Sequence, residues 1–167
     1  MLVDPLAATR TPPSVPSDRR WPGTLGRVNR FDLQRFVDAQ DAAGTYDAAL
    51  AELLAGGKRS HWMWFVFPQV AGLGHSATAQ RYAVSGLAEA RAYLAHPVLG
   101  PRLVACARAL TGLQATDPVE VLGPVDAQKL QSSMTLFARA DPHEAVFQDV
   151  LDQYFEGSPD DATTRRV

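Results

Sequence analysis

The sequence has one cysteine, Cys106, among its 167 residues. A single cysteine cannot form an internal disulfide, and it forms no zinc-binding pattern with the histidines, which also show no i, i+4 pair. We therefore expect no metal site and assign no cofactor. Cys106 itself falls on an apolar stripe and is predicted to be a core residue. A lone thiol and the lack of a secretory signal are typical of a cytoplasmic protein. The four histidines that show no metal-binding spacing are His61, His75, His96 and His143.

Long apolar runs are also missing. The longest extends over the six residues 62–67, whereas a membrane-spanning helix needs about 18 or more apolar residues. The first twenty residues carry charges, among them Asp4 and Arg10, and have no apolar core, so no secretory signal is predicted. We expect no membrane partner.

The sequence also lacks an excess of positive charge. The formal net charge is -2, whereas nucleic-acid binders carry clustered cations that neutralise phosphates. Binding of nucleic acid through Arg19, Arg20, Arg27 and Arg30 is disfavoured for this reason. With 46% hydrophobic and 20% charged residues, the composition is that of one soluble globular domain.

Proline divides the chain into two parts. Residues 1–28 contain five of the twelve prolines and show no sustained periodicity, which predicts a flexible leader. Residues 29–167 form the predicted folded domain.

Helical periodicity dominates from Phe31 onward, and no alternating hairpin pattern is present, so we expect an all-α fold of roughly eight to ten short helices in one compact array. Ser76, Ser85, Asp126 and Asp141 are the predicted N-caps, the last with Pro142 at the first helical position. The predicted helices and turns cover residues 33–40, 46–54, 76–84, 85–94, 99–110, 118–122, 126–137, 141–155 and 161–166.

The aromatic run 62–67 fits either a helix or a buried strand. Ser60 before it favours a helix, its bulky side chains permit a strand, and Pro68 ends either one.

The segment from Lys58 to Gln69 is the densest group of residues with binding chemistry. A helix that begins at Ser60 would place free backbone N–H groups beside Lys58 and Arg59, which is an arrangement that suits a phosphate or carboxylate. Trp62 or Trp64 could then stack on a planar group. The alternative is structural: Ser60 is an ordinary cap, the cations are solvated and the aromatic side chains are core.

A second group lies on the predicted helix 126–137. At about 100° per residue, Asp126, Lys129 and Ser133 share one sector beside the apolar face. A half-buried lysine must be paired or take part in binding. The alternative is a structural Asp126–Lys129 pair on the helix surface.

Two weaker candidates remain. The segment Gly72–Ser76 resembles a phosphate-binding turn but lacks the preceding strand and the third glycine of a dinucleotide fingerprint. Gln40 falls on the apolar face of the first predicted helix, where its amide needs either a protein or a ligand partner.

The sequence resembles a bacterial family of unknown function, DUF1810, from about Phe31 to the C-terminus. The resemblance implies a compact helical domain and no established reaction. Proteins similar to this family are sometimes labelled calpastatin-like, but such inhibitors are long disordered repeats, and this chain has no repeat. The matching segments include 33–37, 58–64, 67–69, 72–74, 96–100, 132–137 and 155–157.

These patterns lead to a hypothesis of a small-ligand pocket between helices, for a nucleotide, an ADP-ribose-like molecule or a sugar phosphate. A hydrolase or transferase activity is left open, as is an alternative function: a protein-interaction module that docks a partner through its aromatic run or its late acidic surface. The candidate proton-transfer residues are His61 and Asp126. The candidate binding residues are Lys58, Arg59, Ser60, Trp62, Trp64, Gln69, Lys129, Ser132 and Ser133.

Overall fold

A computed structural model describes residues 30–167, so the predicted leader over residues 1–28 lies outside the described part. Within that part the regular elements are helices, and strand-like pairing is limited to one parallel bridge between Val70 and Val84. The all-α prediction is confirmed. None of the helices in residues 30–167 combines the length and the apolar character needed to cross a bilayer.

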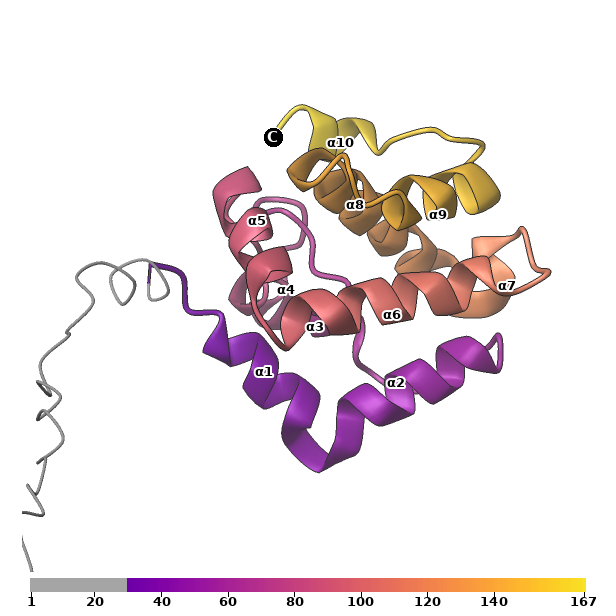
Figure 1. Ribbon diagram of the computed structural model, residues 1–167, viewed down its shortest axis with the longest axis horizontal. Coiled ribbons are helices and arrows are strands. Elements are labelled where there is room, and N and C mark those ends of the chain that lie inside the picture. Colours follow the sequence, from indigo (N-terminus) through magenta and orange to yellow (C-terminus); the bar gives the residue numbers. More distant parts are fainter. Residues whose placement is uncertain (1–29) are drawn as a thin grey trace, which may run out of the picture.

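The helices follow one another through short connections, and Figure 1 labels them in chain order. They are α1 (Gln34–Asp41), the 3-10 turn η1 (Ala42–Gly44), α2 (Thr45–Leu54), α3 (Met63–Val66), α4 (Ala77–Arg81), α5 (Leu87–Ala95), α6 (Leu99–Thr111), α7 (Pro118–Leu122), α8 (Pro124–Ala140), α9 (Val146–Phe155) and α10 (Asp161–Thr164).

Helix α8 is the central packing element, since it contacts α5, α7, α9 and α10. Helix α6 crosses the middle of the molecule and packs on α2, α5 and α9, while α1 and α2 form a V at the bottom of the view (Figure 1). The backbone N–H of Lys58, just after α2, donates to the Val121 carbonyl at 2.8 Å. This bond brings the segment after α2 against α7, beside the start of α8.

A column of buried aromatic rings joins four helices. Phe36 of α1 contacts Tyr93 of α5, with ring centroids 5.1 Å apart; Tyr93 contacts Phe137 of α8 at 5.4 Å; and Phe137 contacts Phe147 of α9 at 5.7 Å. All four rings are fully buried. Tilted and edge-on pairs of this kind contribute roughly 0.5–1.5 kcal/mol each beyond burial of their area, so the column stabilises the centre of the fold.

The amide of Gln40 finds protein partners on both sides. Its Nε2 donates to the Phe65 carbonyl at 2.8 Å and to the Tyr93 hydroxyl at 3.1 Å, and its Oε1 accepts from Arg102 at 3.2 Å. Arg102 also pairs with Asp41 at 2.8 Å. Because both ends of this buried amide are hydrogen-bonded within the protein, Gln40 serves the fold and is removed from the ligand candidates.

Both predicted aspartate caps are wrong. Helix α8 begins at Pro124 after Gly123, whose φ of +82° lets the chain turn sharply from α7, so Asp126 lies inside the helix rather than at its cap. Helix α9 begins at Val146, because the Asp141 carboxylate accepts from the His143 N–H and shapes a turn before the helix. In both cases an aspartate that resembled a cap has another partner.

The serine caps were predicted with mixed success. Ser76 caps α4 as predicted, accepting from the Ala79 N–H at 3.1 Å. Ser60 does not cap: the aromatic run forms the short helix α3, which begins at Met63 after Trp62. Ser85 does not cap either: the N-cap of α5 is Gly86, and the N–H and hydroxyl of Ser85 both donate to Glu89 at 2.8 Å.

The close approach of α5 and α6 gives a stability prediction. A Cβ at Gly100 would overlap the Leu94 carbonyl oxygen, so Gly100→Ala should lower the free energy of unfolding by about 2 kcal/mol or more. Gly112→Ala is the matched control, because Gly112 has helical φ and ψ and its Cβ would meet no atom closer than 3.5 Å; its stability should be unchanged or slightly raised. Urea unfolding followed by circular dichroism measures both, and equal stability of the two variants would contradict the prediction.

Candidate functional site

The candidate site is built on the segment 57–62 that follows α2. Helix α2 ends because Gly56 adopts φ +72° and the Gly57 N–H donates back to the Glu52 carbonyl at 3.0 Å, a pattern typical of a glycine C-terminus. The chain then doubles back along the last turn of α2. Its backbone N–H groups therefore face the Glu52 side chain.

The Glu52 carboxylate accepts four hydrogen bonds from this segment. Its donors are the backbone N–H groups of Arg59 at 2.8 Å and Ser60 at 3.1 Å, the Ser60 hydroxyl at 2.6 Å and the Trp62 indole N–H at 2.8 Å. The backbone N–H groups that the sequence suggested for an external anion are thus occupied by an internal one. Although partial burial alone would raise it, the pKa of Glu52 is lowered to about 2 by these bonds.

The two lysines converge on one carboxylate. Lys58 Nζ lies 2.8 Å from Asp126 Oδ2, and Lys129 Nζ lies 2.8 Å from Asp126 Oδ1. Lys58 also donates to the Ser60 carbonyl at 2.7 Å. The three side chains are 9%, 18% and 16% exposed for Lys58, Lys129 and Asp126, so the charges are largely withdrawn from water.

Each lysine also lies over an indole ring. Lys58 Nζ is 5.1 Å from the ring centroid of Trp62, and Lys129 Nζ is 4.4 Å from that of Trp64. A cation at this distance is attracted by the electrons of the ring face. Trp62 is fully buried and Trp64 is half-buried. We call Lys58, Lys129, Asp126, Trp62 and Trp64 the lysine cluster.

Asp126 is held ionised inside the cluster. Burial alone would raise its pKa, but hydrogen bonds from Lys129 and Lys58, together with the attraction of their charges, lower the pKa of Asp126 below its usual value. A carboxyl group in this state is suited to a counter-ion role rather than to donating a proton at neutral pH.

Of the two α8 serines predicted for the site, one lies on the sector of the cluster and the other faces α10. Ser133 lies on the same sector of α8 as Asp126 and Lys129, fully buried, and its Oγ has no partner among residues 30–167. Ser132 belongs elsewhere: its hydroxyl lies 2.6 Å from Thr163 Oγ1 and joins α8 to α10.

His61, Arg59 and Gln69 complete the set. His61 and Arg59 are exposed on the segment 57–62. Gln69 lies by the single bridge, where its carbonyl accepts from the Val84 N–H at 2.8 Å. Across residues 30–167, no three histidine, cysteine or acidic side chains are arranged to hold a metal ion.

Two surface hollows are relevant to the choice of site. One, of about 210 Å³, adjoins the segment 57–62 and is lined by Ala51, Glu52, Ala55, Gly57 and Arg59. The other, of about 250 Å³, lies between α5 and the end of α8 and is lined by Arg91, Leu94, Ala95, Ala140 and Asp141.

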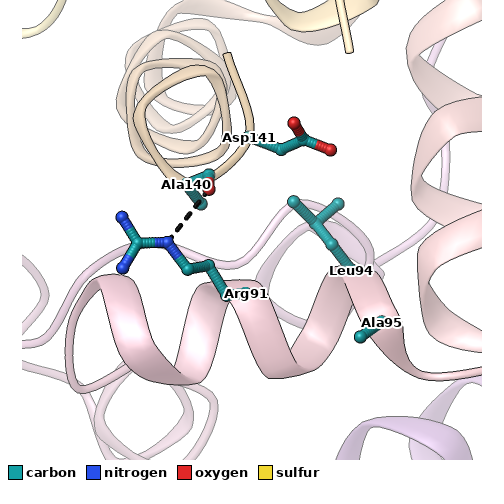
Figure 2. Close-up of a pocket in the computed structure, with 5 residues that line it drawn as sticks. All are labelled: Arg91, Leu94, Ala95, Ala140 and Asp141. Atoms are coloured by element: carbon teal, nitrogen blue, oxygen red, sulfur yellow. Dashed lines mark hydrogen bonds between the residues drawn. The ribbon is translucent and has the colours of Figure 1, made fainter. Parts of the chain in front are cut away.

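The second hollow does not bring its charges together. Arg91 Nε donates to the Ala140 carbonyl at 3.1 Å, and the Arg91 guanidinium and the Asp141 carboxylate point to opposite sides of Ala140 (Figure 2). A bound molecule would therefore meet one charge at most at close range. The lysine cluster, where three charged side chains meet within hydrogen-bond distance, is the better candidate.

The comparisons with known proteins agree with the fold. The family model "Protein of unknown function (DUF1810)" matches residues 30–167. The chain belongs to the DUF1810 family. A crystal structure of the conserved hypothetical protein Rv1873 from Mycobacterium tuberculosis is similar to this DUF1810 chain, with 50% sequence identity, a TM-score of 0.78, and coverage of 81% of this chain and 95% of that one. No curated protein matches the sequence significantly.

Sequence reasoning missed Glu52 in this DUF1810 domain. Its partners are two backbone N–H groups, a hydroxyl and an indole, and no spacing in the sequence encodes that arrangement. A signal for the lysines was available: Lys58 and Lys129 are the only two lysines among the sixteen basic residues of the chain. The sequence hypothesis had already grouped these two lysines with Arg59 around one anionic group, and the structure joins the two lysines through Asp126.

The Glu52 hydrogen bonds give a pH-dependent prediction. Because the pKa of Glu52 falls to about 2 in the folded protein, its contribution to stability is present above the unfolded pKa of about 4.3 and is lost as pH falls from there toward 2. At neutral pH, Glu52→Gln should cost about 1–2 kcal/mol, less than the full pKa difference implies because water screens the partly exposed carboxylate.

Urea unfolding followed by tryptophan fluorescence over a series of pH values measures this effect. The stability difference between wild type and Glu52→Gln should shrink as the pH is lowered. Glu120→Gln, at an exposed glutamate of α7, is the matched control and should behave as wild type. A difference that stays constant down to about pH 2.5 would contradict the role given to the ionised carboxylate.

Proposed function

We propose that this protein binds a small anionic ligand at the lysine cluster, and that the ligand is a phosphate-bearing molecule such as a nucleotide, an ADP-ribose-like molecule or a sugar phosphate. The observation that carries the proposal is that two ammonium groups share one carboxylate, each within 2.8 Å of it, while largely shielded from water.

The charge balance of the site supports an anionic ligand. Lys58, Arg59 and Lys129 supply three positive charges, and Glu52 and Asp126 supply two negative ones. The excess of one positive charge is concentrated at the lysine pair, where Asp126 is the shared counter-ion. Since partly desolvated charges interact more strongly than exposed ones, a second anion beside the two amines would be favourable.

The geometry suggests where that anion binds. Asp126 is bound to both lysines, so we expect the anion where it can reach both ammonium groups from the face away from Asp126. The two positive charges would then lie between two negative ones, which is a favourable electrostatic arrangement. Arg59, exposed on the same segment as Lys58, is available to a more extended ligand.

The proposal is binding rather than catalysis. Asp126 is held as an ionised counter-ion, and His61 lies exposed on the segment 57–62. These two residues, which the sequence favoured for proton transfer, are therefore assigned to charge balance and to the rim of the site.

Removal of one lysine tests the proposal. We expect Lys129→Ala to weaken binding of ribose 5-phosphate by at least about tenfold, because the remaining Lys58–Asp126 pair is neutral. The loss should appear as a missing rise in melting temperature at saturating ligand, since only binding to the native state raises it. The circular dichroism spectrum should remain that of the folded protein.

Two further variants make the result specific. Gln128→Ala changes an exposed neighbour on α8 and should bind ribose 5-phosphate as wild type does. Lys129→Met keeps an unbranched apolar side chain on α8 while it removes the charge. Unfolding of both Lys129→Ala and Lys129→Met, with no ligand response in the wild type, would assign Lys129 a structural role and refute the proposal.

A further inference from the structure

We infer that the ligand of the lysine cluster is a phosphomonoester, recognised through its terminal phosphate and not through a nucleobase. This inference rests on the proposed function and narrows it: within the proposed class, sugar phosphates and nucleoside monophosphates should bind, and ADP-ribose-like molecules, whose phosphates are all bridging, should not.

The two indole rings of the cluster already have partners within the protein. Trp62 is fully buried, its N–H donates to Glu52 at 2.8 Å, and the Lys58 ammonium lies by its face. Trp64 is half-buried, and the Lys129 ammonium lies 4.4 Å from its ring centroid. A base that stacked on this face of Trp64 would have to displace the cation that attracts the phosphate. The rings therefore position the lysines, and base stacking on the occupied face is excluded.

The free donors of the two amines match a terminal phosphate. An ammonium group has three N–H donors. Lys58 uses two of them, on the Ser60 carbonyl and on Asp126, and Lys129 uses one, on Asp126. Among the described residues this leaves one donor on Lys58 and two on Lys129. A terminal phosphate offers three non-bridging oxygens to these three donors, whereas a bridging phosphate or a carboxylate offers two.

Charge favours the same class. A phosphomonoester carries close to two negative charges above its second pKa of about 6, whereas a bridging phosphate carries one. At equal distance from the two amines, the Coulomb attraction is therefore nearly twice as large for the terminal group. The exposed guanidinium of Arg59 adds positive charge on the same segment.

Isothermal titration calorimetry at about pH 7.5, where the phosphomonoester is dianionic, tests the inference. The full chain is titrated with ribose 5-phosphate, AMP, adenosine and ADP-ribose. Ribose 5-phosphate and AMP should bind with affinities within about threefold of each other, because the protein does not recognise the base. Adenosine should not bind, and ADP-ribose should bind at least about tenfold more weakly than AMP.

The variants separate this inference from the proposal beneath it. Lys129→Met should abolish binding of ribose 5-phosphate and AMP alike, and Gln128→Ala should leave both unchanged. Binding of ADP-ribose as tightly as AMP, with dependence on Lys129, would overturn the phosphomonoester inference and keep the anion site. Binding of adenosine would overturn the inference by showing that the base is recognised. Absence of binding by every phosphate-bearing probe, or binding unchanged in Lys129→Met, would refute the proposed site and the inference together.

Discussion

The Glu52 carboxylate is the interaction on which the rest of the site depends. Its four donors all lie within residues 59–62, so one side chain on the last turn of α2 fixes the path of the segment that follows. That path sends the Lys58 side chain toward α8 and seats the Trp62 ring in the core. Hydrogen bonds to an ionised acceptor are among the stronger ones in proteins, which explains how a segment without regular structure can hold an ammonium group in place.

The polar groups of this fold fall into two kinds. In the Gln40 network and in the Arg35–Glu89 pair, with Arg35 also bonded to the Ala83 carbonyl, the donors and acceptors satisfy one another inside the protein. In the lysine cluster, one carboxylate faces two ammonium groups, and N–H donors are left over. Polar residues whose hydrogen-bond donors and acceptors are all satisfied are therefore structural, and the group with donors left over is the candidate site.

Periodicity predicted the helices because most of them bury one face in the hydrophobic core, and burial of a face leaves a 3.6-residue pattern in the sequence. It failed at helix starts where an aspartate had a better partner than the helix N–H groups. Asp126 binds two lysines and Asp141 shapes the turn before α9, and the bond from Lys58, a distant residue, cannot be read from local spacing.

The site was predictable only in part for the same reason. The shared sector of Asp126, Lys129 and Ser133 follows from helical geometry, and the structure places all three on that face of α8. That Lys58 joins them depends on the return of the chain after Gly56, and that Ser132 turns to Thr163 depends on the packing of α10. Contacts between distant segments are set by the fold as a whole.

The position of the two lysines has a practical consequence for handling the protein. Since the chain has no other ε-amine, any reagent directed at lysine, whether a dye ester, a crosslinker or an activated sensor surface, meets among the side-chain amines only those of this cluster. Attachment through lysine would consume the binding groups themselves, so a tether at either terminus is the arrangement that leaves the cluster intact.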